Sequence, residues 1–155
     1  MTVTNVVPGP DGHTLLLASD TEHVALPMAI GDTEAHAIRL RLDGERFQRP
    51  LTHDLLDAVM RELGGQLVRV QVTKVREQAF VATLLVRNEG RLHRFDARPS
   101  DAIALAVGNH APIFVSRAVL ESAGMPLDAQ GRGPLFSPPV RPTPSPPPGR
   151  SNPAP

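Results

Sequence analysis

The sequence predicts an α+β fold: a single compact domain in which a mostly antiparallel sheet packs against helices, followed by a disordered, proline-rich C-terminal tail. Short runs that alternate apolar and polar residues, or are apolar throughout, stand between turns rich in Gly, Pro, Asn and Asp. Other segments change to the period of a helix, and proline supplies 11 of the last 30 residues. The 155 residues match the size of one domain with an ordinary core.

The start of the chain predicts three strands. Residues 3–7 alternate apolar and polar side chains, and residues 14–18 form an apolar run that is typical of a buried strand. Val24–Ile30 predicts the third strand. Pro27 places this strand at an edge or a bulge, because proline has no N–H to donate to a neighbour.

Two helices are predicted next. Residues 32–42 have the period of a helix, and Asp32 or Thr33 can cap its first turn. Residues 52–63 carry an apolar stripe at helical spacing, with Thr52 as the predicted cap and two glycines after the last turn.

The rest of the domain predicts an antiparallel meander, a third helix, a short strand and a last helix. Ser116 is the predicted cap of the last helix, which Gly124 closes. Strands are expected at residues 67–73, 80–86, 92–96 and 113–115, and the third helix is expected at residues 100–107.

The composition shift after Met125 divides the chain into a domain at residues 1–125 and a tail at residues 126–155. A segment so rich in proline and so poor in large apolar side chains cannot offset the entropy cost of ordering. We therefore expect disorder with polyproline II character. PxxP spacings in the tail fit an SH3-like partner, although proline at this density also produces such spacings by chance.

Composition excludes several classes of function. The chain has no cysteine, which excludes disulfides and thiol chemistry and fits a reducing cytoplasm. No window approaches the length of a membrane span, and the N-terminus does not resemble a signal peptide, so we expect a cytoplasmic protein without membrane contact. Sixteen basic residues balance sixteen acidic ones, which weighs against binding nucleic acid by net charge alone.

The first candidate site is the turn before the third helix. Arg98, Ser100 and the unpaired amides of a helix start make it attractive to an anion such as phosphate. Asp96 and Asp101 add carboxylates of the kind that hold Mg²⁺ or Mn²⁺. The alternative is structural: Ser100 or Asp101 caps the helix, and an ion pair between Arg98 and Asp96 fixes the turn.

The second candidate site is the start of the preceding helix. His53 suits a general base near neutral pH, and Asp54 beside it and Arg49 before it complete a polar group. Glu34, in the first turn of the helix before that, is the third candidate. It matters only if the fold brings the three sites together, which the sequence does not show. Each residue also has a structural interpretation as a helix cap or a charge that favours the helix dipole.

These motifs, taken in order, resemble the bifunctional nuclease domain family, once catalogued as a domain of unknown function. The resemblance covers residues 3–124 and leaves out the proline-rich tail. The matching segments are Leu26-Pro27-Met28-Ala29-Ile30-Gly31 with Glu34-Ala35-His36-Ala37-Ile38, Arg49-Pro50-Leu51-Thr52-His53-Asp54-Leu55, Asp96-Ala97-Arg98-Pro99-Ser100-Asp101-Ala102-Ile103-Ala104-Leu105-Ala106, and Ala111-Pro112-Ile113 with Val119-Leu120.

The resemblance implies a self-associating α+β domain with nuclease activity on RNA and DNA. It places Glu34, His53, Asp54, Asp96, Arg98, Ser100 and Asp101 at the family's characteristic positions. The chain departs from the family in having Gly108-Asn109-His110 where an arginine often follows the third helix, and it lacks tryptophan and tyrosine to stack on bases, so base-specific recognition is not expected.

Our leading hypothesis is a nuclease of low sequence preference that acts as a homo-oligomer. In it His53 is the base, Arg98 contacts phosphate with Ser100 and Arg49, and a divalent metal, Mg²⁺ or Mn²⁺, assists. Two alternatives stay open: a non-catalytic module that binds an anion or a partner, and a purely structural role for these residues. The catalytic set is His53, Asp54, Asp96 and Asp101, and the metal set is Glu34, Asp54, Asp96 and Asp101.

Overall fold

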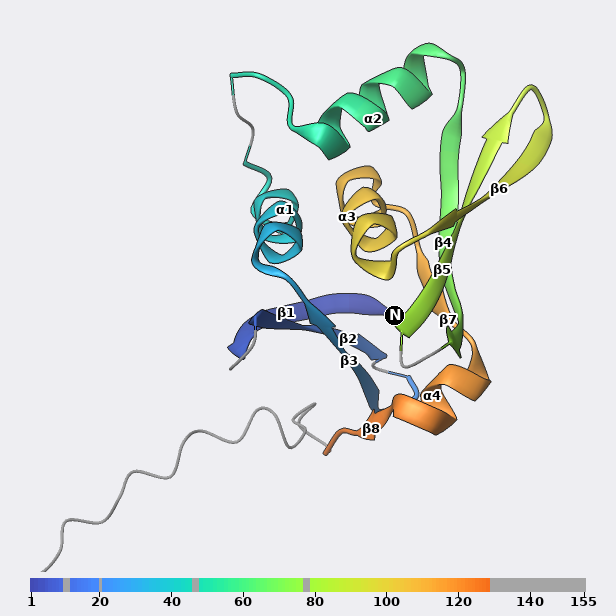
Figure 1. The fold of residues 1–155 in the computed structure, drawn as a ribbon. Coiled ribbons are helices and arrows are strands. Elements are labelled where there is room, and N and C mark those ends of the chain that lie inside the picture. The colour runs from blue at the N-terminus through green and yellow to red at the C-terminus, as the bar shows by residue number, and fades with distance from the viewer. Residues whose placement is uncertain (10–11, 20, 46–47, 77–78, 129–155) are drawn as a thin grey trace, which may run out of the picture.

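The computed structural model describes residues 1–9, 12–19, 21–45, 48–76 and 79–128, and confirms the α+β prediction. Two four-stranded sheets enclose a corner filled by helices (Figure 1). The elements are β1 Thr2–Gly9, β2 Gly12–Ser19, β3 Val24–Ile30, α1 Asp32–Leu42, α2 Thr52–Glu62, β4 Gln66–Arg76, β5 Ala79–Asn88, β6 Arg91–Ala97, α3 Pro99–Asn109, β7 Ile113–Val115, α4 Arg117–Ala123 and β8 Met125–Pro126.

The strands form two sheets where the sequence predicted one. The first has the order β1-β2-β3-β8 and the second β6-β5-β4-β7. All pairs are antiparallel except β4 and β7, whose parallel pairing aligns Val70 with Ile113. Parallel strands need a long connection between them, and α3, which stands between β6 and β7, carries the chain back so that β7 can run parallel to β4. β5 lies in the middle of the β6-β5-β4 meander, as its apolar run predicted.

Pro27 lies at a sheet edge, as predicted. β8 pairs only with Val24 and Ala25, so the rest of β3 has β2 on one side alone. Pro27 is opposite Leu16 in that part of β3. The missing N–H therefore costs the sheet no hydrogen bond on its open side. The fold continues past residue 125, the predicted end of the domain, through β8 and through the hydrogen bond that Leu127 N donates to His23 O. The predicted tail from residue 129 on lies outside the described residues.

The core surrounds α3. Residues 102–106 of this helix are all buried, and α3 packs against α1, β4 and β5 (Figure 1). One apolar cluster combines α3 with side chains of both sheets, among them Leu15, Leu26 and Val70. α4 contacts β3 and β4 and so joins the two sheets on the other side. The described residues contain no helix with the length and apolar character to cross a membrane.

The caps of the first two helices differ from the prediction. Gly31 and Leu51 occupy the N-cap positions, so Asp32 and Thr52 are the first helical residues and neither caps. At α2 the Asp54 carboxylate accepts a hydrogen bond from Leu51 N at 3.0 Å and takes over the role of a cap. Ser116 does cap α4, where its Oγ accepts from Val119 N at 3.3 Å.

The apolar stripe of α2 is not buried. The side of α2 that faces α1 and α3 is polar, and Asp57 is the buried residue of the helix. Four large apolar side chains remain between 46% and 70% exposed, namely Leu55, Leu56, Val59 and Leu63. The periodicity identified the helix correctly but did not show that its polar side is the one docked on the fold.

Candidate functional site

Four of the predicted site residues meet in one hydrogen-bonded group, which we call the Arg98 cluster: Glu34, His53, Arg98 and Asp101. Arg98 donates from Nε to Asp101 Oδ2 at 2.6 Å and from Nη2 to Asp101 Oδ1 at 3.0 Å. Its Nη1 donates to Glu34 Oε1 at 3.1 Å. His53 Nε2 lies 3.2 Å from Asp101 Oδ1. The fold therefore joins the three stretches that the sequence left separate.

The cluster forms because three helices begin at the same place. Glu34 lies in the first turn of α1, His53 in that of α2 and Asp101 in that of α3, while Arg98 is the N-cap residue of α3. Each helix N-terminus carries roughly half a positive charge, which favours the two carboxylates. Pro99 at the start of α3 fixes the backbone of the first turn, so the site stands on rigid elements.

Gly31 makes room for Glu34. A Cβ at position 31 would lie 2.5 Å from Glu34 Oε2, closer than real atoms approach. The backbone of Gly31 is extended, with φ at −76°, so other residues could adopt its conformation. A larger residue at this position would therefore require the end of the Glu34 side chain to move, and that end holds the contact with Arg98.

The exposure of the four side chains differs. Arg98 is 65% exposed, whereas Glu34 is 21%, Asp101 31% and His53 18% exposed. The half-buried carboxylates hold the guanidinium in one orientation at the surface. The three contacts of Arg98 use three of its five N–H donors, which leaves one on each terminal nitrogen for an external anion.

The charges of the cluster shift two pKa values. Partial burial, the largest single effect on Asp101, opposes its ionisation, but the hydrogen bonds and charges of Arg98 and His53 outweigh it and lower the pKa of Asp101. The hydrogen bond and charge of Asp101, followed by those of Glu34, raise the pKa of Arg98. At neutral pH Asp101 is ionised and can only accept. A neutral His53 must therefore carry its proton on Nε2, which leaves Nδ1 as a proton acceptor.

An open cavity of about 550 Å³ adjoins the cluster. Glu34, Arg98 and the buried Ser100 line it, together with the ends of β3 and β5. Asp96 also lines the cavity from β6, where it is exposed. Among the described residues, no hydrogen bond joins Asp96 to Arg98. The predicted Arg98–Asp96 ion pair is thus wrong, since Asp101 is the aspartate that Arg98 binds.

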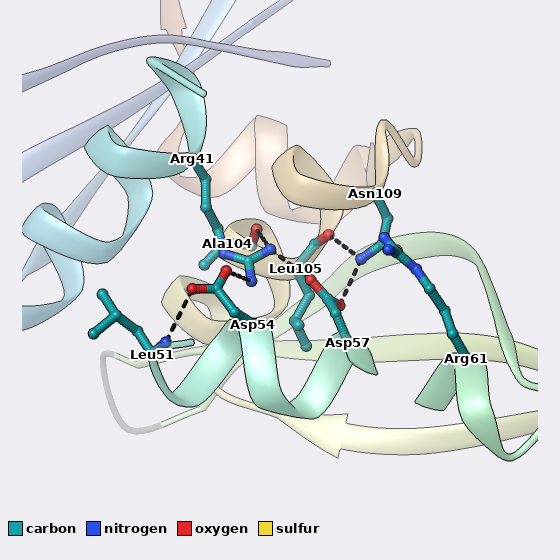
Figure 2. A network of polar contacts seen from close by, with 8 residues as sticks. All are labelled: Arg41, Leu51, Asp54, Asp57, Arg61, Ala104, Leu105 and Asn109. Carbon is teal, nitrogen blue, oxygen red and sulfur yellow. Dashed lines mark hydrogen bonds and ion pairs between the residues drawn. The ribbon is translucent and has the colours of Figure 1, made fainter. Parts of the chain in front are cut away.

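Asp54 points away from the cluster into a second polar network (Figure 2). It accepts from Arg41 Nη2 at 2.9 Å and from Leu51 N. Arg41 also donates to Asp57 Oδ2 at 2.7 Å, and Asp57 Oδ1 accepts from Asn109 Nδ2 at 2.7 Å. The network joins α1, α2 and α3, so Asp54 helps to dock the helix that carries His53.

Sequence reasoning missed the second network. Asp57 and Arg41 are both 8% exposed at the side chain, and Arg61 extends the network by donating to Asn109 Oδ1 at 3.0 Å. A signal was available, because Asp54, Asp57 and Arg61 share one face of α2. Gly108 leaves room for the Arg41 side chain of this network, since a Cβ at position 108 would overlap Arg41 Nη1.

Arg49, predicted to bind substrate, lies exposed in the segment before α2 and is not among the residues that line the cavity.

The predicted Mg²⁺ or Mn²⁺ site does not fit this arrangement. In the part of the chain that the structure describes, no group of three or more His, Asp or Glu side chains is placed to hold a metal ion. Both Asp101 oxygens face Arg98, Glu34 is paired with Arg98, and Asp54 is paired with Arg41. Carboxylates whose charge is already balanced by arginine are poor ligands for a divalent cation.

A family model described as "Bifunctional nuclease domain" matches residues 15–128. The chain belongs to this family. It is 40% identical over 111 residues to a protein of Mycobacterium tuberculosis described as uncharacterized, covering 72% of this chain and 66% of that protein. It is 26% identical over 126 residues to Bifunctional nuclease 1 of Arabidopsis thaliana, covering 79% of this chain and 39% of the plant protein.

Other relatives in this family are plant proteins too. Bifunctional nuclease 2 of Oryza sativa subsp. japonica is 25% identical over 119 residues, which cover 75% of this chain and 37% of the rice protein. The chain thus spans just under two thirds of its mycobacterial relative and less than two fifths of the plant nucleases. The matched region includes every member of the Arg98 cluster.

Proposed function

We propose that this protein is a nuclease that hydrolyses phosphodiester bonds of RNA and DNA with low sequence preference. The observation that carries the proposal is the Arg98 cluster. Its exposed guanidinium lines a cavity and is held by Asp101, which also contacts His53; neither His53 nor Asp101 lines that cavity itself. The family supports the same reaction class, because the plant relatives are named bifunctional nucleases.

Arg98 is the proposed phosphate contact. Its two remaining N–H donors can bind the non-bridging oxygens and stabilise the charge that grows on them as the nucleophile attacks. The cluster itself carries two carboxylates against one guanidinium, so the start of α3 must supply part of the attraction. The amide groups of its first turn, beside Ser100, face no earlier helical carbonyl and are available to an anion.

His53 is the proposed general base. Its Nδ1 takes a proton from the attacking oxygen, which is the 2′-hydroxyl in RNA or a water in DNA. As the bond from phosphorus to the leaving oxygen breaks, the protonated ring returns this proton through water to the leaving oxygen. Asp101 fixes the tautomer and orientation of the ring and stabilises its protonated form. Asp96 lines the cavity together with Glu34 and Arg98, and is the proposed second carboxylate that orients the attacking water.

The experiment is cleavage of labelled single-stranded RNA and DNA by homogeneous protein, with and without EDTA. His53→Ala and Asp101→Asn should each lower the rate by about a hundredfold or more, and Arg98→Lys by a smaller factor because a lysine loses the bidentate contact. The EDTA arm tests the predicted need for Mg²⁺ or Mn²⁺. Variants that all cut as fast as the parent would assign the activity to another site or to a contaminant.

The second candidate function is a non-catalytic module that binds an anion or a partner at the same cavity. The neutral net charge of the chain and the absence of tryptophan and tyrosine favour it over an efficient nuclease. Protein that cleaves neither substrate with any added divalent metal, but binds inorganic phosphate in an Arg98-dependent way, would support this function.

Three further expectations belong to the proposal. We propose a cytoplasmic location, because the chain lacks cysteine. We propose a homo-oligomer, as the resemblance implies. The disordered tail predicted at residues 126–155, with its SH3-like partner, stays a prediction from composition for the residues after Asp128, because Pro126 and Leu127 belong to the fold.

A further inference from the structure

The second sheet has one face packed on α3 and one face directed away from it. α3 contacts β4 and β5, and the core side chains of these strands include Val70 and Ala82. Figure 1 shows α1, α2 and α3 on the same side of this sheet. Because side chains alternate between the two faces along a strand, Arg69 and Thr83, the neighbours of these core residues, point to the other side. We call that side the outer face.

The outer face is strongly basic. On β5 the odd-numbered residues point to it, and their partners on β4 and β6 point the same way, since paired residues share a face. The register thus places five basic side chains on the outer face, namely Arg69, Lys74, Arg76, Arg87 and Arg94. The strands β4, β5, β6 and β7 contain a single acidic residue, Asp96, which is on the same face.

These positive charges are not neutralised within the fold. None of the five basic side chains forms an ion pair in the part of the chain that the structure describes. Four of them are exposed, and the half-buried Arg69 has its guanidinium carbon 5.9 Å from the centre of the Phe114 ring. The buried Nε of Arg69 has no hydrogen-bond partner among the described residues. The neutral net charge of the whole chain therefore hides a face that attracts anions.

The outer face also offers a surface for stacking. Phe114 of β7 is 50% exposed and is paired with Gln71, a residue of the outer face. A base can stack on an exposed aromatic ring or on the plane of an arginine. Leu85, between Arg69 and Arg94 in the register, is fully buried, as expected where long arginine side chains lie over an apolar one.

The outer face is continuous with the cavity beside the Arg98 cluster. Val81 and Asp96 belong to the face, and both line that cavity. Arg87 follows Val81 on the same side of β5 at a distance of about 20 Å, from a rise of about 3.3 Å per residue. Basic side chains of β4, β5 and β6 thus extend from the rim of the cavity along the sheet.

We propose that a single strand of RNA or DNA binds along the outer face, with its phosphates on the five basic side chains and a base against Phe114, and leads into the cavity beside the Arg98 cluster. The inference rests on the proposed function for what happens in the cavity. Binding to the outer face can be measured without cleavage.

A single nucleic-acid strand fits the outer face better than an acidic peptide or a membrane. Its negative charges repeat along the chain, as the basic side chains repeat over three strands, and its bases are free to stack on protein side chains. A duplex keeps its bases stacked inside. A membrane surface would match the charge but would leave the continuity with the cavity unexplained.

Fluorescence anisotropy with a labelled single-stranded oligonucleotide of about 12 residues tests the binding. The full chain carries His53→Ala, so that the probe is not cut. Arg87→Gln and Arg94→Gln should each raise the dissociation constant about three- to tenfold and reduce the slope of log K against log salt by about 0.7, because each removes one phosphate contact. Phe114→Leu should raise the dissociation constant about tenfold and leave the slope unchanged, because leucine cannot stack on a base.

Arg91→Gln is the matched control. Arg91 is exposed on the same strand as Arg94, but it shares the opposite face with His93 and Phe95, which line a cavity beside α2. The change should leave both the dissociation constant and the salt slope as they are. A loss as large as that of Arg94→Gln, or a salt slope that no outer-face variant reduces, would overturn the proposal. Binding of phosphatidylserine vesicles in place of the oligonucleotide would also overturn it.

Cleavage kinetics separate this proposal from the proposed function. With His53 intact, the double variant Arg87→Gln with Arg94→Gln should raise KM for a long single strand about tenfold or more and leave kcat unchanged. Cleavage of a dinucleotide, too short to reach the outer face, should stay the same. A parent chain that binds the oligonucleotide through the outer face but cuts no substrate would contradict the nuclease alone. Cleavage of long strands with a KM unaffected by the double variant would overturn the outer-face proposal alone.

Discussion

Replacement of Asp57 by asparagine should cost about 3 kcal/mol of unfolding free energy. The Asp57 carboxylate accepts from Arg41 on one oxygen and from Asn109 on the other, both at 2.7 Å, and is nearly buried. Asparagine has the same size but one acceptor oxygen, so one of the two donors would face an NH₂ group. The charge of Arg41, 8% exposed at the side chain, would also lose its buried counter-ion.

Asp54→Asn is the matched control. It makes the same chemical change on the same helix and affects the same arginine, but the Asp54 side chain is 43% exposed. Water can replace the lost partner there, so the expected cost is about 0.5–1 kcal/mol. The comparison therefore isolates the effect of burial.

Urea unfolding of the full chain at neutral pH measures both costs, and an unchanged m value would show that the unfolded state is not responsible. Hydrogen exchange should show α2 losing protection in the Asp57 variant before the rest of the fold. A loss below about 1 kcal/mol for Asp57→Asn, or equal losses for the two variants, would refute the argument that this network docks α2.

Three further predictions concern the site and a cap. Gly31→Ala should displace the Glu34 carboxylate from Arg98 and lower cleavage by the same factor as Glu34→Gln, with no further loss when the two are combined; additive losses would contradict this. The pKa of Asp101 is lower in the folded protein than its ordinary value of 3.8. Ionised Asp101 therefore stabilises the fold at pH values above 3.8, and this contribution is lost as the pH falls through the pKa of the folded state. The stability difference between the parent and Asp101→Asn, measured by urea unfolding, should therefore shrink from about pH 6 to about pH 2, and a constant difference would contradict it. Ser116→Ala should cost about 1 kcal/mol in thermal unfolding through loss of the α4 cap, and an unchanged melting temperature would count against the cap.

Much of the fold could be predicted because periodicity is a local property. Val24–Ile30 and Asp32–Leu42 have the bounds that the sequence predicted, and Ser116 caps the helix it was expected to cap. The division into two sheets and the parallel β4–β7 pair could not be predicted. They depend on where α3 returns the chain, which no short stretch of sequence encodes.

The candidate site was predicted in its residues but not in its pairings. Asp54 follows His53 in the chain, yet on a helix neighbours point about 100° apart, so His53 faces Asp101 and Asp54 faces Arg41. Arg98 has carboxylates near it on both sides in sequence. The first turn of α3 brings Asp101 to it, while β6 carries Asp96 away as part of a strand.

The position of α3 has a consequence for folding. One helix supplies core side chains to α1 and to the second sheet, and α4, which follows it, contacts strands of both sheets. The N-terminal ammonium group donates to Ile113 O at 2.7 Å, so the two ends of the domain are joined as well. Neither sheet can bury its apolar face without segments that come late in the chain. The domain should therefore unfold in one cooperative transition, and no fragment that stops before α3 should hold a stable structure.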